Sequence, residues 1–291
     1  MKNKGLIITL ISIFSLLTIS LIILMHILIN NKTSFGFKFN YKQESYELQL
    51  EKNYEEIFNE INIDTKSANI EIKKSDDNII KLKSYSYEGA TTEQVRNNKL
   101  SIEIEEETCK FLCINTKISK LELYIPENYE NKININNKYG NVTIDKFENL
   151  DVDIEENAGN VKIDTVNTAN IDNKYGNVEI ENINKGNIIA SAGNIEIKNS
   201  NNLKIENKYG NVELSNVNEY VNIDAKCGSI KIDNLNITED SYINNDYGDI
   251  KVKHTSAYVN AKVKLGDSKI NNNQSDVTVN ITNNCGDIEV N

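Results

Sequence analysis

The sequence has few of the residues that usually carry catalysis or bind metals. Tryptophan is absent, proline occurs once, as Pro126, and the 291 residues include only two histidines, His26 and His254. His26 lies in an apolar N-terminal run, so no Ser/His/Asp or Cys/His set can be assembled. No glycine-rich phosphate loop and no CxxC pair occur. We therefore predict no catalytic, cofactor-binding or metal-binding residues, no cofactor, and no enzymatic activity.

Negative charge outweighs positive charge. The net charge is −11, and removing the two cations of the first thirty residues, Lys2 and Lys4, leaves −13 on the rest. A nucleic-acid partner requires a basic face that neutralises phosphates, and direct docking on anionic lipid has a similar requirement. The composition thus excludes nucleic acid as the expected partner. The bias toward Asn, Ile and Lys is typical of AT-rich coding and suggests a low-GC bacterium.

The four cysteines, Cys109, Cys113, Cys227 and Cys285, do not show metal-ligand spacing. Cys109 and Cys113 are close enough in sequence to be bridged across a turn or loop, and the sequence leaves this open. Cys227 and Cys285 occupy repeat positions where an apolar residue is expected. We predict that these two are buried free thiols that behave as small hydrophobic side chains.

An uncharged apolar run of 24 residues, Leu6–Ile29, predicts an N-terminal transmembrane helix. At ~1.5 Å per residue it spans about 36 Å, enough for a hydrocarbon core of ~30 Å. A cleavable signal peptide is the alternative, but its apolar region is shorter and ends in small residues, which residues 25–29 lack. We expect a cytoplasmic tail and anchor in residues 1–30, a tether and N-terminal cap in 31–58, and a single-pass membrane protein whose domain, 59–291, is extracytoplasmic.

A glycine followed by a strand-like segment recurs along the chain at intervals of 17 to 20 residues. Such a period is the signature of a repeat architecture. An outlying copy, Ser67–Ile72, has Ala68 at the glycine position. The nine glycine copies are Tyr139–Ile144, Ala158–Ile163, Tyr175–Ile180, Ala192–Ile197, Tyr209–Leu214, Cys227–Ile232, Tyr247–Val252, Leu265–Ile270 and Cys285–Val290.

Apolar residues alternate with polar ones on both sides of each glycine. Counted from the glycine, they fall at +2 and +4, as in Val178 and Ile180, and at −7 and −5, as in Leu203 and Ile205. This alternation predicts two short half-buried strands per repeat. Two strands and two corners can close one coil, so we predict an all-β parallel β-solenoid of about nine coils of 17–20 residues stacked ~4.8 Å apart. A meander folded into a sandwich is the alternative, but it does not explain the fixed period.

The corners carry three further expectations. The glycines should adopt positive φ. The residue before each glycine alternates between large and small, as Tyr175 and Ala192 do, and we expect these tyrosines to pack between the smaller residues. An exposed tyrosine ladder that binds glycan is the alternative. Asp249, Asp267 and Asp287 follow glycines and could place carboxylates in register for calcium, but the G-G-x-G-x-D motif of calcium-binding β-rolls is absent.

The two ends of the repeat region are expected to differ. Residues 59–130 form the leading part of the domain with longer strands, predicted at Asn78–Tyr87, Lys99–Glu105 and Ile118–Ile125. Pro126 ends the last of these and leads into the regular repeats. A solenoid needs caps that cover its open edges, yet we find no cap after the last strand signal at residue 290.

The strand Leu123–Glu127, which reads LYIPE, followed by ordered copies of G-[ND]-[VI]-x-[IVL], resembles the DUF4097 family over residues 59–291. This resemblance implies a bacterial surface protein of the adhesin type with no catalytic residues to carry over. It also implies an association with the cell envelope, and some members of the family are associated with envelope-stress signalling. We therefore expect an adhesin or envelope-binding module with an unknown protein or glycan ligand. The alternative is a sensor that holds a protein partner through the solenoid. A polysaccharide-cleaving β-helix is not favoured, because the acidic residues occupy solvated outward positions.

Overall fold

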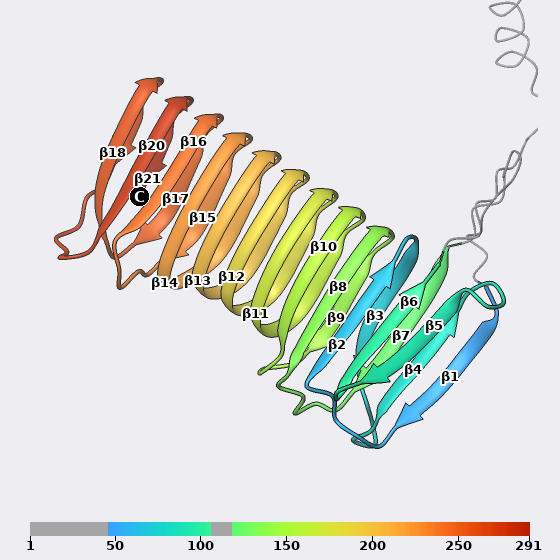
Figure 1. Ribbon diagram of the computed structural model, residues 1–291. Coiled ribbons are helices and arrows are strands. Elements are labelled where there is room, and N and C mark those ends of the chain that lie inside the picture. The colour runs from blue at the N-terminus through green and yellow to red at the C-terminus, as the bar shows by residue number, and fades with distance from the viewer. Residues whose placement is uncertain (1–45, 106–117) are drawn as a thin grey trace, which may run out of the picture. The chain divides into compact units, whose positions relative to one another are not determined.

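A computed structural model describes residues 46–105 and 118–291, and all regular elements in them are β-strands (Figure 1). None of these residues belongs to a helix long and apolar enough to cross a membrane. The predicted membrane helix, Cys109 and Cys113 lie outside the described residues. The strands are β1 (Leu48–Tyr54), β2 (Glu60–Thr65), β3 (Ala68–Lys74), β4 (Ile80–Tyr85), β5 (Thr91–Arg96), β6 (Lys99–Ile104), β7 (Ser119–Ile125), β8 (Lys132–Tyr139), β9 (Val142–Lys146), β10 (Asp151–Ala158), β11 (Val161–Tyr175), β12 (Val178–Ala192), β13 (Ile195–Tyr209), β14 (Val212–Cys227), β15 (Ile230–Leu235), β16 (Ser241–Tyr247), β17 (Ile250–Thr255), β18 (Tyr258–Leu265), β19 (Ser268–Ile270), β20 (Thr278–Cys285) and β21 (Ile288–Val290).

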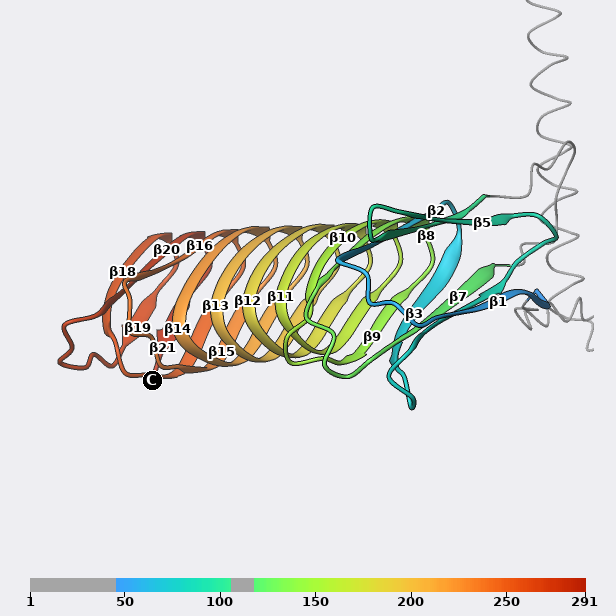
Figure 2. The same cartoon turned by 60° about the horizontal axis from the view of Figure 1, so that its bottom comes forward.

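The strands form a parallel β-solenoid of about eight turns (Figure 2). Each turn has one strand on each of two faces, joined at a glycine corner. Face A consists of β5, β6, β2, β8, β10, the C-terminal halves of β11–β14, β16, β20 and β18 in spatial order. Face B consists of β1, β4, β7, β3, β9, the N-terminal halves of β11–β14, β15, β17, β21 and β19. The predicted all-β parallel solenoid is confirmed.

The inward register is the one that the alternation predicts. Val178 is 0% exposed, and Ile180, Leu203 and Ile205 are also buried. Parallel pairing aligns identical repeat positions, for example Val178 with Ile195 and Ile180 with Ile197. Branched aliphatic side chains therefore stack on one another along the whole interior, which gives one continuous core.

Most of the repeat glycines adopt positive φ as predicted, with values from +122° at Gly248 to +147° at Gly193. Gly159 is the exception, since its φ is not in the positive range. A second constraint applies to all nine. A Cβ built on Gly159 would lie 1.6 Å from the carbonyl oxygen of Gly140, and one on Gly176 would lie 2.0 Å from that of Gly159. Neighbouring coils thus approach too closely at this corner for any side chain.

Asparagine side chains tie each coil to the next. At the position after the glycine, Asn177 donates its backbone N–H to the side-chain oxygen of Asn160 at 2.9 Å, and Asn194 does the same to Asn177. At the opposite bend, the Nδ2 of Asn216 donates to the Oδ1 of Asn199 at 2.8 Å. Inside the solenoid, the buried Asn173 donates to the glycine carbonyls of its own coil and the preceding one. These hydrogen bonds pair backbone N–H and C=O groups that the corners would otherwise leave without partners.

At both ends, the order of coils in space differs from their order in the chain. The β2–β3 turn lies between the β6–β7 and β8–β9 turns. The β20–β21 turn lies between β16–β17 and β18–β19, so the last segment of the chain is an inner one. The β18–β19 turn, at the end of the stack, is mostly exposed. The solenoid has about eight turns, whereas the repeats predicted about nine.

The expectation that the C-terminal end has no cap is wrong. The β18–β19 turn covers β20 and β21, and the segment that follows β19 protects part of the new edge. Asn272 accepts a hydrogen bond from the N–H of Val259 at 2.7 Å and donates one to its carbonyl at 3.0 Å. This side chain therefore occupies backbone groups that an added strand would use. At the other end, β1, β4 and β5 pair antiparallel and close the first coils.

Candidate functional site

Four tyrosines stand in a row along the glycine corner. They are the residues just before the glycine in alternate coils, and their exposed fractions are 54% for Tyr139, 64% for Tyr175, 63% for Tyr209 and 61% for Tyr247. Tyrosine rings are enriched at binding interfaces, and a regular exposed row of them is a candidate recognition surface. We call this row the tyrosine edge.

The tyrosine edge corrects the packing expectation. Ala158 is the register partner of both Tyr139 and Tyr175, so large and small residues do alternate in space. The rings nevertheless project into solvent, because the chain turns at the next residue and the side chain before the turn leaves the stack. Cys227 and Cys285 occupy the same row. Both are free, as predicted, but they are only partly buried, so the prediction that they are buried is wrong.

A row of lysines runs beside the tyrosines. Lys138, Lys174 and Lys208 each precede a tyrosine of the edge and are exposed. Lys174 donates a hydrogen bond to Asn157 at 2.7 Å, and none of the three forms an ion pair with another described residue. Their ammonium groups are therefore available to an anionic ligand.

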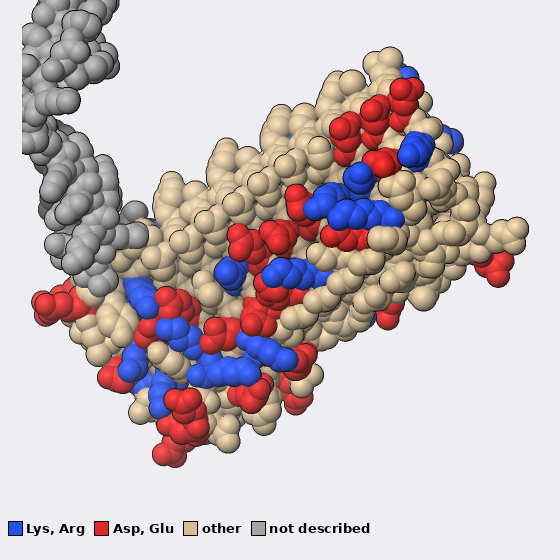
Figure 3. All heavy atoms as spheres, turned by 180° about the vertical axis from the view of Figure 1, so that it is seen from behind, with Lys and Arg blue, Asp and Glu red and all other residues tan. Residues whose placement is uncertain are grey.

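Face B differs from this row, because most of its lysines form ion pairs with acidic residues. Figure 3 shows basic and acidic side chains intermixed in a band along the solenoid on the side opposite to Figure 1. The ion pairs of face B include Lys198–Glu181 at 2.6 Å, Lys231–Glu213 at 3.5 Å, Lys251–Glu289 at 2.7 Å and Lys253–Asp233 at 2.7 Å. Such exposed pairs stabilise little, but they neutralise most of the lysines of this face.

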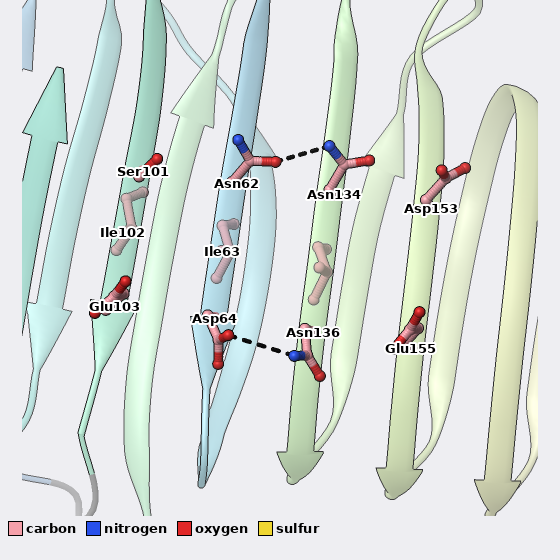
Figure 4. A pocket seen from close by; sticks show the side chains of 11 residues that line it. Asn62, Ile63, Asp64, Ser101, Ile102, Glu103, Asn134, Asn136, Asp153 and Glu155 are labelled. Atoms are coloured by element: carbon pink, nitrogen blue, oxygen red, sulfur yellow. Dashed lines mark hydrogen bonds between the residues drawn. The ribbon is translucent and has the colours of Figure 1, made fainter. Parts of the chain in front are cut away.

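An open groove of about 450 Å³ crosses face A over β6, β2, β8 and β10 (Figure 4). Its polar lining includes the carboxylates of Asp64, Glu103, Asp153 and Glu155. Asn136 donates to Asp64 at 3.4 Å, and Lys132 forms an ion pair with Asp153. The groove is a shallow stretch of sheet surface whose carboxylates face water. It lacks the desolvated acid and opposed base that glycoside hydrolysis requires.

One carboxyl group in the described part of the chain has a pKa raised into the neutral range. Burial raises the pKa of Glu156 to about 7, although hydrogen bonds from Ala158 and Asn137 act in the opposite direction. The side chain is only 1% exposed and points into the solenoid, where Asn137 donates to it at 2.8 Å. A general acid must reach its substrate, and this group cannot.

A second charged cluster lies on face B near the N-terminal end. Glu122 contacts Lys73 and Lys120, each at 2.8 Å, and Glu71 also pairs with both lysines. Partial burial alone would raise the pKa of Glu122, but the two ammonium groups dominate and lower it to about 2. Both acids are matched by two cations, so the cluster is a structural ion network.

The three aspartates that directly follow a repeat glycine lie in consecutive coils, in the order Asp249, Asp287, Asp267. Asp249 accepts the backbone N–H of Asp287 at 3.0 Å, and Asp287 accepts that of Asp267 at 2.9 Å. They thus continue the asparagine ladder of the earlier coils. Within residues 46–105 and 118–291, no three acidic, histidine or cysteine side chains are placed to hold a metal ion.

The fold and the edge define a class of protein, a β-solenoid that exposes a periodic aromatic row. The chain belongs to the Toastrack DUF4097 family, whose sequence model matches residues 58–199 and 184–291. The expected family membership is therefore confirmed. No match is found among curated proteins.

Solved structures share the fold. A protein from Bacteroides fragilis named "putative adhesin" is 19% identical to this chain and superposes on it with a TM-score of 0.51. The match spans 84% of this chain and 97% of that protein. A protein from Parabacteroides distasonis named as a putative lipid-binding protein is 13% identical, with a TM-score of 0.48. That match spans 83% of this chain and 96% of the other. At 19% identity, the likeness to the Bacteroides fragilis protein shows the fold alone.

Proposed function

We propose that this chain is a non-catalytic, membrane-anchored surface module whose solenoid binds a component of the cell envelope, in the manner of an adhesin. The observation that carries the proposal is the tyrosine edge, a solvent-facing aromatic row on a rigid scaffold. Family membership supports a surface role, since a solved structure with the same fold is named as an adhesin. The apolar run Leu6–Ile29 supports an anchor that holds the solenoid outside the membrane.

The absence of catalysis in this proposal rests on the chemistry of the described side chains. Glu156, whose pKa is raised, points into the solenoid, and the carboxylates that line the groove on face A are in contact with water. His254 is exposed and its Nδ1 contacts the backbone carbonyl of Asp233 at 3.2 Å. Binding therefore accounts for the surface better than bond cleavage.

The location is tested with externally added protease on intact protoplasts that express the full chain. The solenoid should be digested while a cytoplasmic marker survives, and the mature N-terminus should still precede Leu6. A solenoid that is degraded only after lysis would contradict the proposed orientation.

Binding is tested with the full chain purified in detergent and mixed with isolated, washed cell envelopes. We expect saturable co-sedimentation, with the bound polymer recovered at its original length. A chain that stays in the supernatant at all envelope concentrations would overturn the binding role. Shortening of the polymer, absent with heat-inactivated protein, would overturn the non-catalytic assignment.

A further inference from the structure

The tyrosine edge has a fixed pitch. Hydrogen-bonded register places Tyr175, Ala192 and Tyr209 in three successive coils, so successive rings are separated by two coils. Parallel strands lie ~4.8 Å apart, which puts the Cα atoms of neighbouring tyrosines about 9.6 Å apart. Ala158 and Ala192 leave a gap between rings, where a bulky substituent of a ligand has room.

The charge of this corner is opposite to that of the whole protein. We define the corner strip as the two residues before the glycine, the glycine and the residue after it, in the six coils of Gly140 to Gly228. Its charged residues are Lys138, Lys174, Lys208 and Lys226. The strip therefore contains no acid, in a chain whose net charge is −11. Lys138, Lys174 and Lys208 each precede a tyrosine of the edge, so one cation accompanies each of the first three rings. The fourth ring, Tyr247, is preceded by Asp246 and lies outside the corner strip.

We infer that the tyrosine edge binds a linear acidic polysaccharide whose repeating unit is a disaccharide with one carboxylate. Aromatic rings stack on the apolar faces of sugars, and two coils match the length of two linked pyranoses in an extended chain. Each lysine then lies within reach of one carboxylate per repeat, and the gap at each alanine accommodates the sugar between two rings. This inference rests on the proposed function and specifies its ligand.

A second copy of this chain is the rival occupant, because tyrosines of one edge could insert at the alanines of another. Charge argues against it. If two corner strips packed against each other, Lys138, Lys174 and Lys208 of both copies would lie close together. Neither strip contains an acid that could neutralise them. A polyanion instead gains from each lysine, and its binding should weaken with salt.

The test measures the affinity of the full chain in detergent for hyaluronan oligosaccharides, which carry one carboxylate per disaccharide, and for neutral chitin oligosaccharides. Two edge variants are compared with wild type. One carries Tyr139→Ala, Tyr175→Ala and Tyr209→Ala, and the other carries Lys138→Gln, Lys174→Gln and Lys208→Gln. The matched control replaces Lys162, Lys198 and Lys231 of face B with Gln. Acidic wall polymer from the source cells is a parallel arm that distinguishes a self-derived ligand from a host-derived one.

We expect hyaluronan or the acidic wall polymer to bind, chitin to bind more weakly, and the tyrosine variant to lose at least about tenfold in affinity. The lysine variant should lose affinity and most of its salt dependence, whereas the face B control should match wild type. Because all six side chains are exposed, the thermal unfolding midpoint should be unchanged, which separates lost binding from lost folding.

Three results would overturn the inference. If the chain co-sediments with envelopes and the edge variants do so equally well, the edge is not the site, although the proposed function stands. If wild type binds neither acidic polymer nor envelope, both proposals fail. If the tyrosine variant changes a dimer into a monomer in sedimentation without affecting polysaccharide binding, a second copy is the occupant.

Discussion

At the scale of the residue, two constraints act on the corner glycines, and the structure separates them. Gly89 has a positive φ of +76° but nothing lies within 4 Å of where its Cβ would be. Gly159 lacks the positive φ, yet its Cβ would lie 1.6 Å from the carbonyl oxygen of Gly140. Most repeat glycines combine both features, so substitution there cannot show which one matters.

We therefore predict that Gly159→Ala destabilises the domain far more than Gly89→Ala. The first should cost at least about 3 kcal/mol, because two coils must move apart, and the second about 1 kcal/mol for an alanine forced to positive φ. Urea unfolding of the full chain in detergent, followed by circular dichroism, measures both. Equal effects would mean that backbone conformation alone selects glycine in the repeat.

The residue scale also gives the asparagine content a physical role. Asn160, Asn177 and Asn194 each accept a backbone N–H from the next coil, a task for which a short side chain with an acceptor oxygen is needed. A bias in coding can supply asparagine, but only stacking explains why it recurs at the same position in successive coils.

At the scale of the element, the order of the C-terminal strands in space differs from their order in the chain. β20 has hydrogen-bonded neighbours on both sides, β16 and β18, whereas β18 is the outermost strand of face A. Burial follows the same order, since Val279 and Ile281 of β20 are buried while much of β18 is exposed. Local opening should follow position in the stack, not position in the chain.

Hydrogen–deuterium exchange of the native protein tests this arrangement. We predict that amides of β20, residues 278–285, exchange at least about tenfold more slowly than those of β18, residues 258–265, because β20 pairs with a strand on both sides and β18 on one side only. β16 provides the internal reference and should resemble β20. Faster exchange in β20 than in β18 would place the last strand at the end of the stack, as chain order alone suggests.

At the scale of the whole molecule, one buried acid should make stability depend on pH near neutrality. The folded-state pKa of Glu156 is about 7, above the ordinary value of 4.5. Between these two values the folded protein binds more protons than the unfolded chain, so its stability falls as pH rises and levels off above about 7. Glu122 acts in a separate window, where stability is lost as pH falls from 4.5 toward about 2.

Glu156→Gln should therefore remove most of the decline between pH 5 and pH 8 and stabilise the protein at pH 8 by up to about 3 kcal/mol. The measurement is the free energy of unfolding in urea across that range. The control is Glu155→Gln, the exposed neighbour, which should keep the wild-type slope. A wild-type curve that is flat from pH 5 to pH 8 would show that Glu156 is not desolvated as the fold implies.

Local repetition in the sequence determined the solenoid, its glycine corners and its inward register, because period-two alternation at a fixed spacing specifies which side chain enters the core. The same repeated motif also indicated the family to which the chain belongs. Two features depended on tertiary structure. The inner position of β20–β21 arises from pairing over long sequence separation, which local pattern does not encode. The exposure of Tyr175 and its equivalents was decided at the corner, where the direction of the backbone turn, and not residue size, sets whether a ring packs between coils or projects into water.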